Sequence, residues 1–453
     1  MKHVAAALGL VVLFIWIAMA ADERLPQSPS FEALASAPPL GWNSYDCYGM
    51  LATEGDIKAN ADYLATHLKA YGWTYVVLDY LWYAEGLTAD NVRDKDPVQN
   101  IDAYGRLSPS PALHPSSTNG RGLKPLADHV HRLGLKFGLH IMRGIPLQAI
   151  AANAPVLGTS VRARDIADPK DGCSWYAGLV GVDTARTGGQ EYYDSLLKLY
   201  AEWGVDYIKA DDMCSPYHAT EIEAVSRAIQ KCGRPMVLSL SPGPAPLDQA
   251  SHLARFAHLW RISGDFWDEW PKVLAQFDLC RAWAPHLTPG HWPDADMLPL
   301  GKLSIRTDLK GFVPRDTRLT RAEQRTVMTL WSIFRSPLMM GGNLPDCDAW
   351  TLSLLTNPEV LAVDQSGTGA HELFARDGRV AWVSVAPGSE DLYLALFNAT
   401  DHDPLEVGVM AADLGRKGPL RVRDLWERRD LGQFSERFSV SLPAHGAGLY
   451  RIR

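Results

Sequence analysis

The chain has 453 residues, 47% of them hydrophobic, and a formal net charge of −8 at pH 7. This length and apolar content predict a globular protein, with one large domain and a small one or with two to three ordinary domains. The acidic balance and the lack of a basic patch exclude a nucleic-acid partner.

The start of the chain has the pattern of a secretory signal peptide. A short positive start at Lys2 and His3 precedes apolar residues 4–17 and an A-x-A cleavage site at residues 18–20. The alternative, a membrane anchor, is disfavoured because the apolar run is short for a membrane span. We therefore expect an exported protein, secreted or periplasmic, that leaves the membrane once residues 1–20 are removed. Residues 21–36 are rich in Pro, Ser and Ala, which predicts a linker.

Residues 37–365 alternate between buried-type strands and helices. The apolar runs that predict strands of a parallel sheet are residues 74–81, 135–142, 205–210, 236–240 and 259–262. Repeated strand and helix units over this length predict an α/β fold, a (β/α)8 TIM barrel. A doubly wound sheet is the alternative, but no Gly-rich phosphate loop follows any of these strands.

Two helices illustrate the pattern between the strands. Thr53 is the expected N-cap of a helix whose apolar stripe is Ile57, Ala61, Leu64 and Leu68. Gly204 is the expected end of another helix, whose stripe is Tyr193, Leu196, Leu197 and Tyr200. Both stripes have the spacing of an amphipathic helix with one buried face.

Residues 366–453 have a different sequence pattern. They contain short β-type runs separated by turns, at residues 380–385, 392–397, 438–442 and 448–452, and no long helical stripe. This pattern predicts a separate antiparallel β-sandwich domain at the C-terminus.

Two carboxylates predict the chemistry. An apolar run ends in Lys209 and Asp211, and side chains two residues apart in a strand point to the same face. Lys209 should therefore share a pocket with Asp211 and lower the pKa of that carboxyl, which keeps it ionised as a nucleophile. A second carboxylate, Asp265, follows Arg261. Two carboxylates in distinct surroundings are what glycoside hydrolysis needs.

Neighbouring acids are alternatives for both positions. Asp212 follows the first candidate directly, but strand parity places it on the face opposite to Lys209. Asp268 and Glu269 lie close to Asp265 in the sequence.

The motifs together resemble glycoside hydrolase family 27, the family of α-galactosidases and α-N-acetylgalactosaminidases. The matching segments occur in the family's order and span nearly the whole expected mature chain: residues 40–45, 73–82, 134–138, 207–211, 260–265, 292–298 and 334–338. The resemblance implies a retaining mechanism, with Asp211 as the nucleophile and Asp265 as the acid/base. We expect apolar neighbours, Trp260 and Phe266, to enclose Asp265.

The resemblance also implies a set of sugar contacts. Asp79 matches a carboxylate that binds ring hydroxyls, and Lys209 matches a hydroxyl donor. Arg261 corresponds to a residue near the 2-hydroxyl, and Trp42 to a tryptophan of the pocket wall. Asp296 lies in the motif of the seventh strand, where direct contact and an indirect role are both open. Neither a metal nor an organic cofactor is implied, because the two carboxylates supply the chemistry.

Three pocket positions depart from the galactosidase pattern. Tyr80 stands where those enzymes have a second aspartate, which binds the C4 and C6 hydroxyls together with the first. His140 replaces a tyrosine of the third strand, and Ser241 replaces a glutamate that reads the 2-hydroxyl. The family also contains β-L-arabinopyranosidases and an isomalto-dextranase, so its scaffold accommodates such changes.

The favoured activity is an exported, retaining α-galactosidase that cleaves terminal α-D-galactosyl residues of an oligosaccharide or glycoside. One alternative is the same mechanism on a β-L-arabinopyranoside, an α-N-acetylgalactosaminide or an α-glucan such as isomalto-dextran. The other is a sugar-binding protein without catalysis. The sequence predicts no oligomeric state.

The six cysteines contain no C-x-x-C pair, which disfavours a zinc site. An exported chain permits disulfides, and buried free thiols are equally compatible with the sequence. The family resemblance implies a disulfide between Cys173 and Cys214 at the pocket rim, although Cys214 is offset by one residue from the family position.

Overall fold

The computed structural model describes residues 31–88, 98–306 and 313–453. The expected signal peptide at residues 1–20 lies outside the described residues, as does the first part of the expected linker, so export stays a prediction. Within the described ranges no helix combines the length and the apolar character that a membrane crossing requires.

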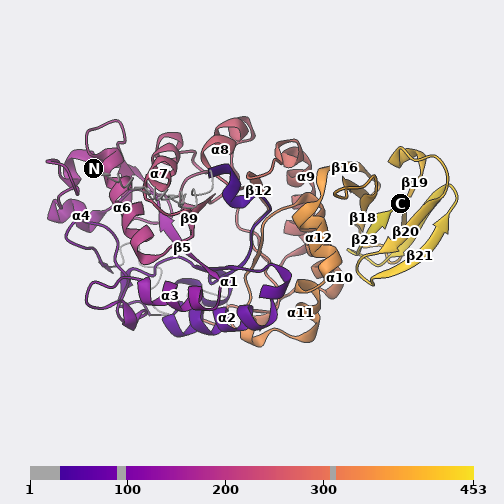
Figure 1. Cartoon of the computed structure of the whole chain (residues 1–453), viewed down its shortest axis with the longest axis horizontal. Helices are drawn as coiled ribbons and strands as arrows, with labels where there is room; N and C mark the ends of the chain where they lie inside the picture. The colour runs from indigo at the N-terminus through magenta and orange to yellow at the C-terminus, as the bar shows by residue number, and fades with distance from the viewer. Residues whose placement is uncertain (1–30, 89–97, 307–312) are drawn as a thin grey trace, which may run out of the picture.

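The larger part of the chain is a parallel, eight-stranded sheet curled into a barrel (Figure 1). Its strands are β1 (Leu40–Asn43), β2 (Tyr75–Leu78), β5 (Lys136–Met142), β9 (Tyr207–Asp211), β10 (Val237–Leu240), β11 (Leu259–Arg261), β12 (Trp292–Asp294) and β15 (Leu338–Met340). Their spatial order is β12-β11-β10-β9-β5-β2-β1-β15. The backbone of Leu298, just after β12, closes the ring: its N–H donates to the Met339 carbonyl at 2.7 Å. The predicted TIM barrel is confirmed.

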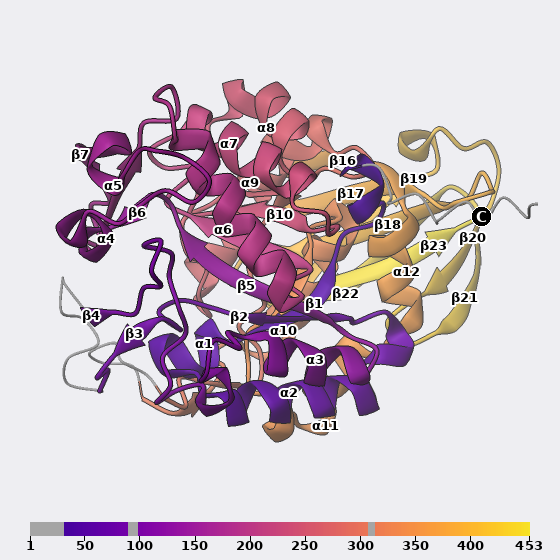
Figure 2. The same cartoon turned by 60° about the vertical axis from the view of Figure 1, so that its left-hand side comes forward.

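Helices surround the barrel, and one of them follows each strand. They are α2 (Glu54–His67), α3 (Lys124–Arg132), α6 (Gly189–Trp203), α7 (Ala219–Lys231), α8 (Ala250–Phe256), α9 (Trp270–Trp283), α10 (Arg321–Phe334) and α12 (Pro358–Ser366). Figure 2 shows α2 and α3 side by side on the barrel wall. Short helices α1 (Tyr45–Tyr48), α4 (Leu147–Ala152), α5 (Ala163–Ile166) and α11 (Ala349–Leu355) lie in the connections.

The two predicted helix signals are confirmed. The Thr53 hydroxyl accepts a hydrogen bond from the Asp56 N–H at 3.3 Å, and the Asp56 side chain accepts one from the Thr53 N–H at 2.9 Å. This reciprocal capping box begins α2. Gly204 ends α6 with φ of 89°, a left-handed conformation that glycine adopts without steric cost.

A long insertion between β5 and α6, residues 143–188, builds one wall above the barrel. It contains α4, α5 and a three-stranded sheet of β6 (Ile145–Pro146), β7 (Ala167–Gly172) and β8 (Leu179–Val182). In Figure 1 this β5–α6 insertion lies at the end of the molecule opposite to the C-terminal strands. Two-stranded ribbons, β3 (Ala84–Glu85) with β4 (Val98–Gln99) and β13 (Lys302–Leu303) with β14 (Arg315–Asp316), extend other loops.

The C-terminal part is the predicted antiparallel β-sandwich. A six-stranded sheet has the order β16-β17-β18-β23-β20-β21, and a two-stranded sheet pairs β19 with β22. The strands are β16 (Thr368–Arg376), β17 (Arg379–Val385), β18 (Leu392–Asn398), β19 (Leu405–Met410), β20 (Leu420–Asp424), β21 (Arg429–Phe434), β22 (Arg437–Leu442) and β23 (Ala447–Ile452). A separate apolar core, with Leu394, Val407 and Phe438 buried in it, joins the two sheets.

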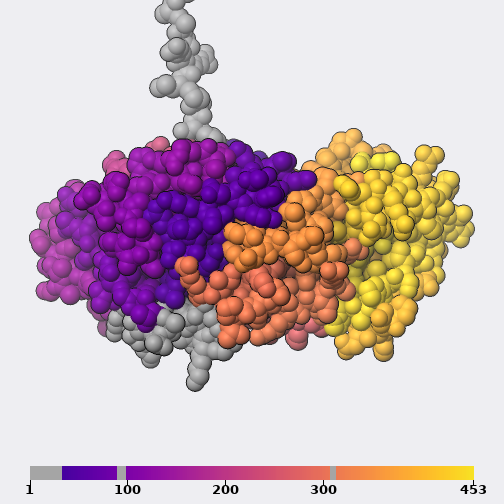
Figure 3. All heavy atoms as spheres, turned by 90° about the horizontal axis from the view of Figure 1, so that it is seen from below, coloured from indigo at the N-terminus to yellow at the C-terminus, as the bar shows by residue number. Residues whose placement is uncertain are grey.

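Helix α10 joins the barrel to the sandwich. It packs on β18 and β23, and the Trp426 Nε1–H donates to the Thr329 hydroxyl at 3.0 Å. The Asn357 side chain donates to the Leu425 carbonyl at 3.0 Å. Figure 3 shows the yellow C-terminal domain in direct contact with the orange part of the chain. These contacts hold the sandwich against the side of the barrel.

The structure does not form the predicted disulfide, because all six cysteines, each within the described residues, are free thiols. The one-residue offset places Cys214 in the apolar core, where it is fully buried, while Cys173 is half-buried. Burial raises the pKa of both thiols, that of Cys173 to about 12. Protonated, enclosed thiols are poor partners for disulfide exchange.

Candidate active site

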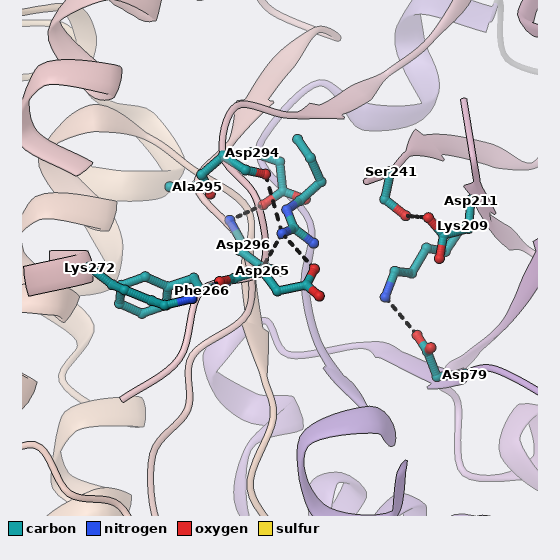
Figure 4. A network of polar contacts seen from close by, with 12 residues as sticks. Asp79, Lys209, Asp211, Ser241, Asp265, Phe266, Lys272, Asp294, Ala295 and Asp296 are labelled. Atoms are coloured by element: carbon teal, nitrogen blue, oxygen red, sulfur yellow. Dashed lines mark hydrogen bonds and ion pairs between the residues drawn. The ribbon is translucent and has the colours of Figure 1, made fainter. Parts of the chain in front are cut away.

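The carboxyl ends of the barrel strands surround a pocket with a cavity volume of about 350 Å³. This is the end at which TIM-barrel enzymes place their catalytic groups. Acidic and basic side chains from the ends of four strands line it: Asp79 after β2, Lys209 and Asp211 in β9, Arg261 and Asp265 at and after the end of β11, and Asp296 after β12. In Figure 4, Asp79, Lys209, Asp211 and Ser241 lie on one side of the pocket, and Asp265 and Asp296 lie on the other.

Lys209 binds a different carboxylate from the one that its sequence position suggests. Its Nζ donates to Asp79 Oδ2 at 2.8 Å, and the Asn43 side-chain amide donates to the same oxygen at 2.7 Å. Burial alone would raise the pKa of Asp79, but the charge of Lys209 and these hydrogen bonds outweigh it and hold the pKa far below its usual range. Asp79 is therefore an ionised acceptor at the pocket floor.

Asp211 is held by side chains from the two neighbouring strands. Ser241, directly after β10, donates its hydroxyl to Oδ1 at 2.9 Å. His140, from β5, lies with Nε2 at 3.0 Å from Oδ2. Because an ionised carboxylate can only accept, Nε2 carries the hydrogen of this bond.

The Asp211 carboxylate is poised in its charged form. Burial opposes ionisation, but the hydrogen bond and electrostatic interaction with His140, helped by the charge of Lys209, lower its pKa below the usual value. The predicted placement of Lys209 and Asp211 in one pocket is confirmed, and the Asp211 carboxylate takes its hydrogen bonds from His140 and Ser241.

Asp265 lies on the opposite side of the pocket beside a buried arginine. The Arg261 Nη2 donates to Asp265 Oδ1 at 3.3 Å and pairs with Asp296 Oδ2 at 2.6 Å. Asp296 Oδ2 also accepts the Phe266 N–H at 2.8 Å, so it fixes the loop that carries Asp265. This places Asp296 in an indirect role as well as on the pocket wall.

The apolar enclosure expected around Asp265 is absent. Its side chain is 67% exposed. Trp260 is fully buried and packs against Trp283, while the Phe266 ring packs against Trp331. The Asp265 carboxylate therefore opens toward solvent at the pocket mouth, where a leaving group or water can reach it.

The alternative acids lie away from the pocket. Asp212 is buried and pairs with Arg143 at 2.9 Å, and Asp268 is buried and pairs with Arg315. Neither lines the cavity. Strand parity therefore distinguished Asp211 from Asp212 correctly.

Comparison with known proteins identifies the family. Residues 172–366 match the family described as "Alpha galactosidase A", and residues 377–452 match the "Alpha galactosidase C-terminal beta sandwich domain". A GH27 β-L-arabinopyranosidase from Geobacillus stearothermophilus is 48% identical in sequence, with a TM-score of 0.91 over 94% of this chain and 98% of that chain. The chain belongs to glycoside hydrolase family 27.

Other family 27 relatives are less similar. A Bacillus halodurans protein assigned as an α-N-acetylgalactosaminidase is 43% identical, with a TM-score of 0.82 over 92% of this chain and 96% of that chain. The "Alpha-galactosidase A" of Cellvibrio japonicus is 27% identical over 100% of this chain and 99% of its own length. The protein is therefore a family 27 glycoside hydrolase, and both of these relatives are more distant from it than the arabinopyranosidase is.

Two residues expected in the pocket of this family 27 enzyme lie behind it. Trp42 is fully buried, and its Nε1–H donates to the Gly342 carbonyl at 2.9 Å. His140 is also fully buried and reaches the pocket only through Asp211. Trp42 therefore supports the wall from the core, and His140 supports the candidate nucleophile from below.

Tyr80 lies in the wall of the pocket with little exposed surface. Its ring makes edge contacts with His140, Trp175 and Tyr176, with centroids 5.3, 5.8 and 5.5 Å away. Burial raises the pKa of the phenol well above its usual value, so Tyr80 stays neutral.

The sequence reasoning missed several other lining residues, among them Tyr45, Asp46, Trp175 and Trp267. Tyr45 and Asp46 begin α1 immediately after β1, so their position past a strand end was a usable signal. Trp175 comes from the β5–α6 insertion, where no strand or helix pattern predicts contact with the pocket.

Proposed function

We propose that this enzyme is a retaining β-L-arabinopyranosidase. The observation that carries the proposal is Tyr80, a neutral aromatic residue where galactosidases of the family have a carboxylate for the C4 and C6 hydroxyls. The 48% identity to the Geobacillus stearothermophilus β-L-arabinopyranosidase supports the same substrate. α-Galactosidase activity, which the sequence favoured, becomes the second candidate because the named α-galactosidase relatives are at most 27% identical.

The stereochemistry of the two sugars explains why Tyr80 favours one of them. β-L-Arabinopyranose has the ring and hydroxyl configuration of α-D-galactose but lacks the C6 hydroxymethyl group. A neutral phenol cannot replace a carboxylate that accepts two hydroxyl hydrogens, because charge-assisted hydrogen bonds are about twice as strong as neutral ones. The Tyr80 ring is also larger than an aspartate side chain, so it disfavours the extra hydroxymethyl group.

The proposed reaction proceeds in two displacements. Asp211 attacks the anomeric carbon and forms a covalent bond to it, while the bond to the leaving oxygen breaks and Asp265 gives that oxygen its proton. Asp265, now ionised, then takes a proton from water. The water oxygen attacks the same carbon, and the Asp211 carboxylate leaves. Two inversions at one carbon give net retention of configuration.

The electrostatics of the pocket match these roles. The lowered pKa of Asp211 provides the charged nucleophile. The ionised Asp79, fixed by Lys209 and Asn43 at Oδ2 and by the Tyr80 N–H at Oδ1, can accept a hydrogen bond from a sugar hydroxyl. Arg261 lies between the acid/base and Asp296, where it holds the loop of Asp265 in place.

A panel of nitrophenyl glycosides tests the substrate, and Tyr80 variants test its cause. We expect a higher kcat/KM for the β-L-arabinopyranoside than for the α-D-galactoside, by about tenfold or more. Tyr80→Asp should move the ratio toward the α-D-galactoside, whereas Tyr80→Phe, which keeps the ring, should preserve the arabinoside preference. A wild-type enzyme that prefers the α-D-galactoside, with a ratio that Tyr80→Asp leaves unchanged, would contradict the proposal.

The acid limb of the pH profile tests how Asp211 is kept ionised. Because its pKa lies below the usual value, kcat/KM should fall only below about pH 4, the ordinary range of an aspartate. In His140→Phe the burial of Asp211 remains while the compensating hydrogen bond is lost, so the pKa rises and the limb moves to higher pH. Ser241→Ala removes a neutral hydrogen-bond donor to Asp211 and should move the acid limb of the pH profile less. An unmoved limb in His140→Phe would show that His140 does not set this ionisation.

A further inference from the structure

Asp46 is a buried acid that faces the sugar pocket and has no structural task for its side chain. It lies in α1, is 5% exposed and lines the cavity. Its Oδ2 is enclosed and has no hydrogen-bond partner among the described residues. The backbone carbonyl of Asp46 does accept the Ser304 N–H at 2.8 Å, so the main chain is anchored while the carboxyl group is not.

The surrounding chain leaves space for this carboxyl group. A Cβ atom at Gly341, just after β15, would lie 2.0 Å from Asp46 Oδ2 and 2.6 Å from its Cγ. Any larger residue at Gly341 would displace Asp46 from its place. A polar group that is buried without a partner is costly, so its retention requires an explanation.

The charges around Asp46 determine its protonation. Burial raises its pKa well above the usual value, and the negative charges of Asp296, Asp79 and Asp265 raise it further, while Lys209 opposes them. Burial and these charges therefore favour the neutral form of Asp46, which has one O–H donor and one carbonyl acceptor.

The ionised carboxylates of the pocket can only accept hydrogen bonds. Lys209 and Arg261 can donate, but each is also paired with a carboxylate of the pocket, Asp79 and Asp296 respectively. A pyranose hydroxyl both donates and accepts, so its oxygen needs a donor from the protein. A neutral acid supplies such a donor without adding another negative charge.

We propose that Asp46 is a further sugar-binding residue, which donates a hydrogen bond to a hydroxyl of the bound pyranose. Because Oδ2 is enclosed beside Gly341, the contact with the sugar is made by the other carboxyl oxygen, Oδ1. This role deepens the proposed function and rests on it only for the identity of the sugar, because any pyranose in the pocket presents hydroxyl groups.

Two variants of similar size test this role. Asp46→Asn keeps a donor and an acceptor, and Asp46→Leu keeps the volume but removes both. On the glycoside that the wild-type enzyme cleaves best, Asp46→Asn should stay within about fivefold of the wild-type kcat/KM, and Asp46→Leu should lose about tenfold or more. The loss should lie mainly in KM, and the affinity for the product sugar, measured by calorimetry, should fall with it.

Stability and deoxy sugars separate binding from packing. Because Asp46→Leu removes an unpaired buried polar group, its melting temperature should equal or exceed that of the wild type. Among monodeoxy substrates, the one that lacks the partner hydroxyl should be cleaved less well by the wild type, and Asp46→Leu should no longer distinguish it from the parent glycoside.

Two results would overturn the inference. Wild-type KM and product affinity in Asp46→Leu would show that the carboxyl group does not touch the sugar. An equal loss in Asp46→Asn and Asp46→Leu would show that a neutral donor is not what the site requires. Failure of the arabinopyranosidase proposal is a separate outcome, because it is seen in the substrate panel with the wild-type enzyme.

Discussion

Asp211→Asn should lower kcat by a factor on the order of 10⁴ or more while the protein remains folded. The amide is nearly the same size and can keep the contact to Ser241, which lies 2.9 Å from Oδ1. An amide is neutral, however, and does not form the covalent bond to the anomeric carbon. The measurement is steady-state hydrolysis, with circular dichroism to confirm folding.

Asp212→Asn is the matched control for this prediction. Asp212 is the next residue, but it is buried outside the pocket and pairs with Arg143. Its neutralisation should leave turnover within about tenfold of the wild-type value, because it contacts no reacting atom. Near wild-type turnover in Asp211→Asn, with loss of turnover in Asp212→Asn, would show that Asp212 is the nucleophile. The assignment from strand parity would then be wrong.

Arg143→Met should lower the free energy of unfolding by about 3–5 kcal/mol, the cost of leaving buried charges without their partner. The Arg143 side chain is almost fully buried and makes ion pairs with Asp171 at 2.8 Å, Asp212 at 2.9 Å and Glu221 at 2.6 Å. Burial opposes its charge, but the carboxylates of Glu221 and Asp212 outweigh burial and raise its pKa. Removal of the guanidinium would leave three carboxylates facing one another.

The same arginine positions the candidate nucleophile. The backbone N–H of Arg143, which any residue but proline keeps, donates to the Asp211 carbonyl at 3.0 Å, and the side-chain Nε donates to the Asp212 carbonyl at 3.1 Å. Asp212 has φ of 61°, a left-handed conformation that is costly for a residue with a Cβ and persists where the surroundings fix it. Arg143→Met should therefore lower kcat as well as stability.

Arg143→Lys is the control that keeps the positive charge but loses the planar guanidinium group. A lysine keeps one positive charge but cannot reach three carboxylates with a planar fork, so its loss of stability should be smaller than that of Arg143→Met. Urea unfolding of all three proteins at one pH provides the comparison. Equal midpoints for the wild type and Arg143→Met would show that this buried network does not stabilise the fold.

Long apolar runs made most of the barrel predictable from the sequence. β5 and β9 have long enough buried runs to be recognised, and they extend close to the predicted limits. β12 and β15 have only three residues each, and β12 contains Pro293. Neither strand is long enough to show a hydrophobic periodicity from which it could be predicted. Their strand conformation comes from the parallel neighbours, such as the pairing of Leu259 with Trp292.

Most of the charged residues of the site could be predicted from the sequence, but their contacts could not. Parity assigns a face of a strand, so it placed Lys209 and Asp211 in one pocket. It carries no information about partners from other strands, and these decide that Lys209 binds Asp79. Ser241 and His140, interpreted as sugar contacts, turned out to hold the Asp211 carboxylate.

The configuration of the first sugar released tests the central proposal, a retaining β-L-arabinopyranosidase, most directly. Proton NMR during hydrolysis of nitrophenyl β-L-arabinopyranoside distinguishes the two anomers of arabinose before they equilibrate. We predict that β-L-arabinose appears first and that the α-anomer follows only by mutarotation. Initial release of α-L-arabinose would contradict the covalent mechanism through Asp211, and no release from this substrate, with rapid cleavage of the α-D-galactoside, would contradict the proposed specificity.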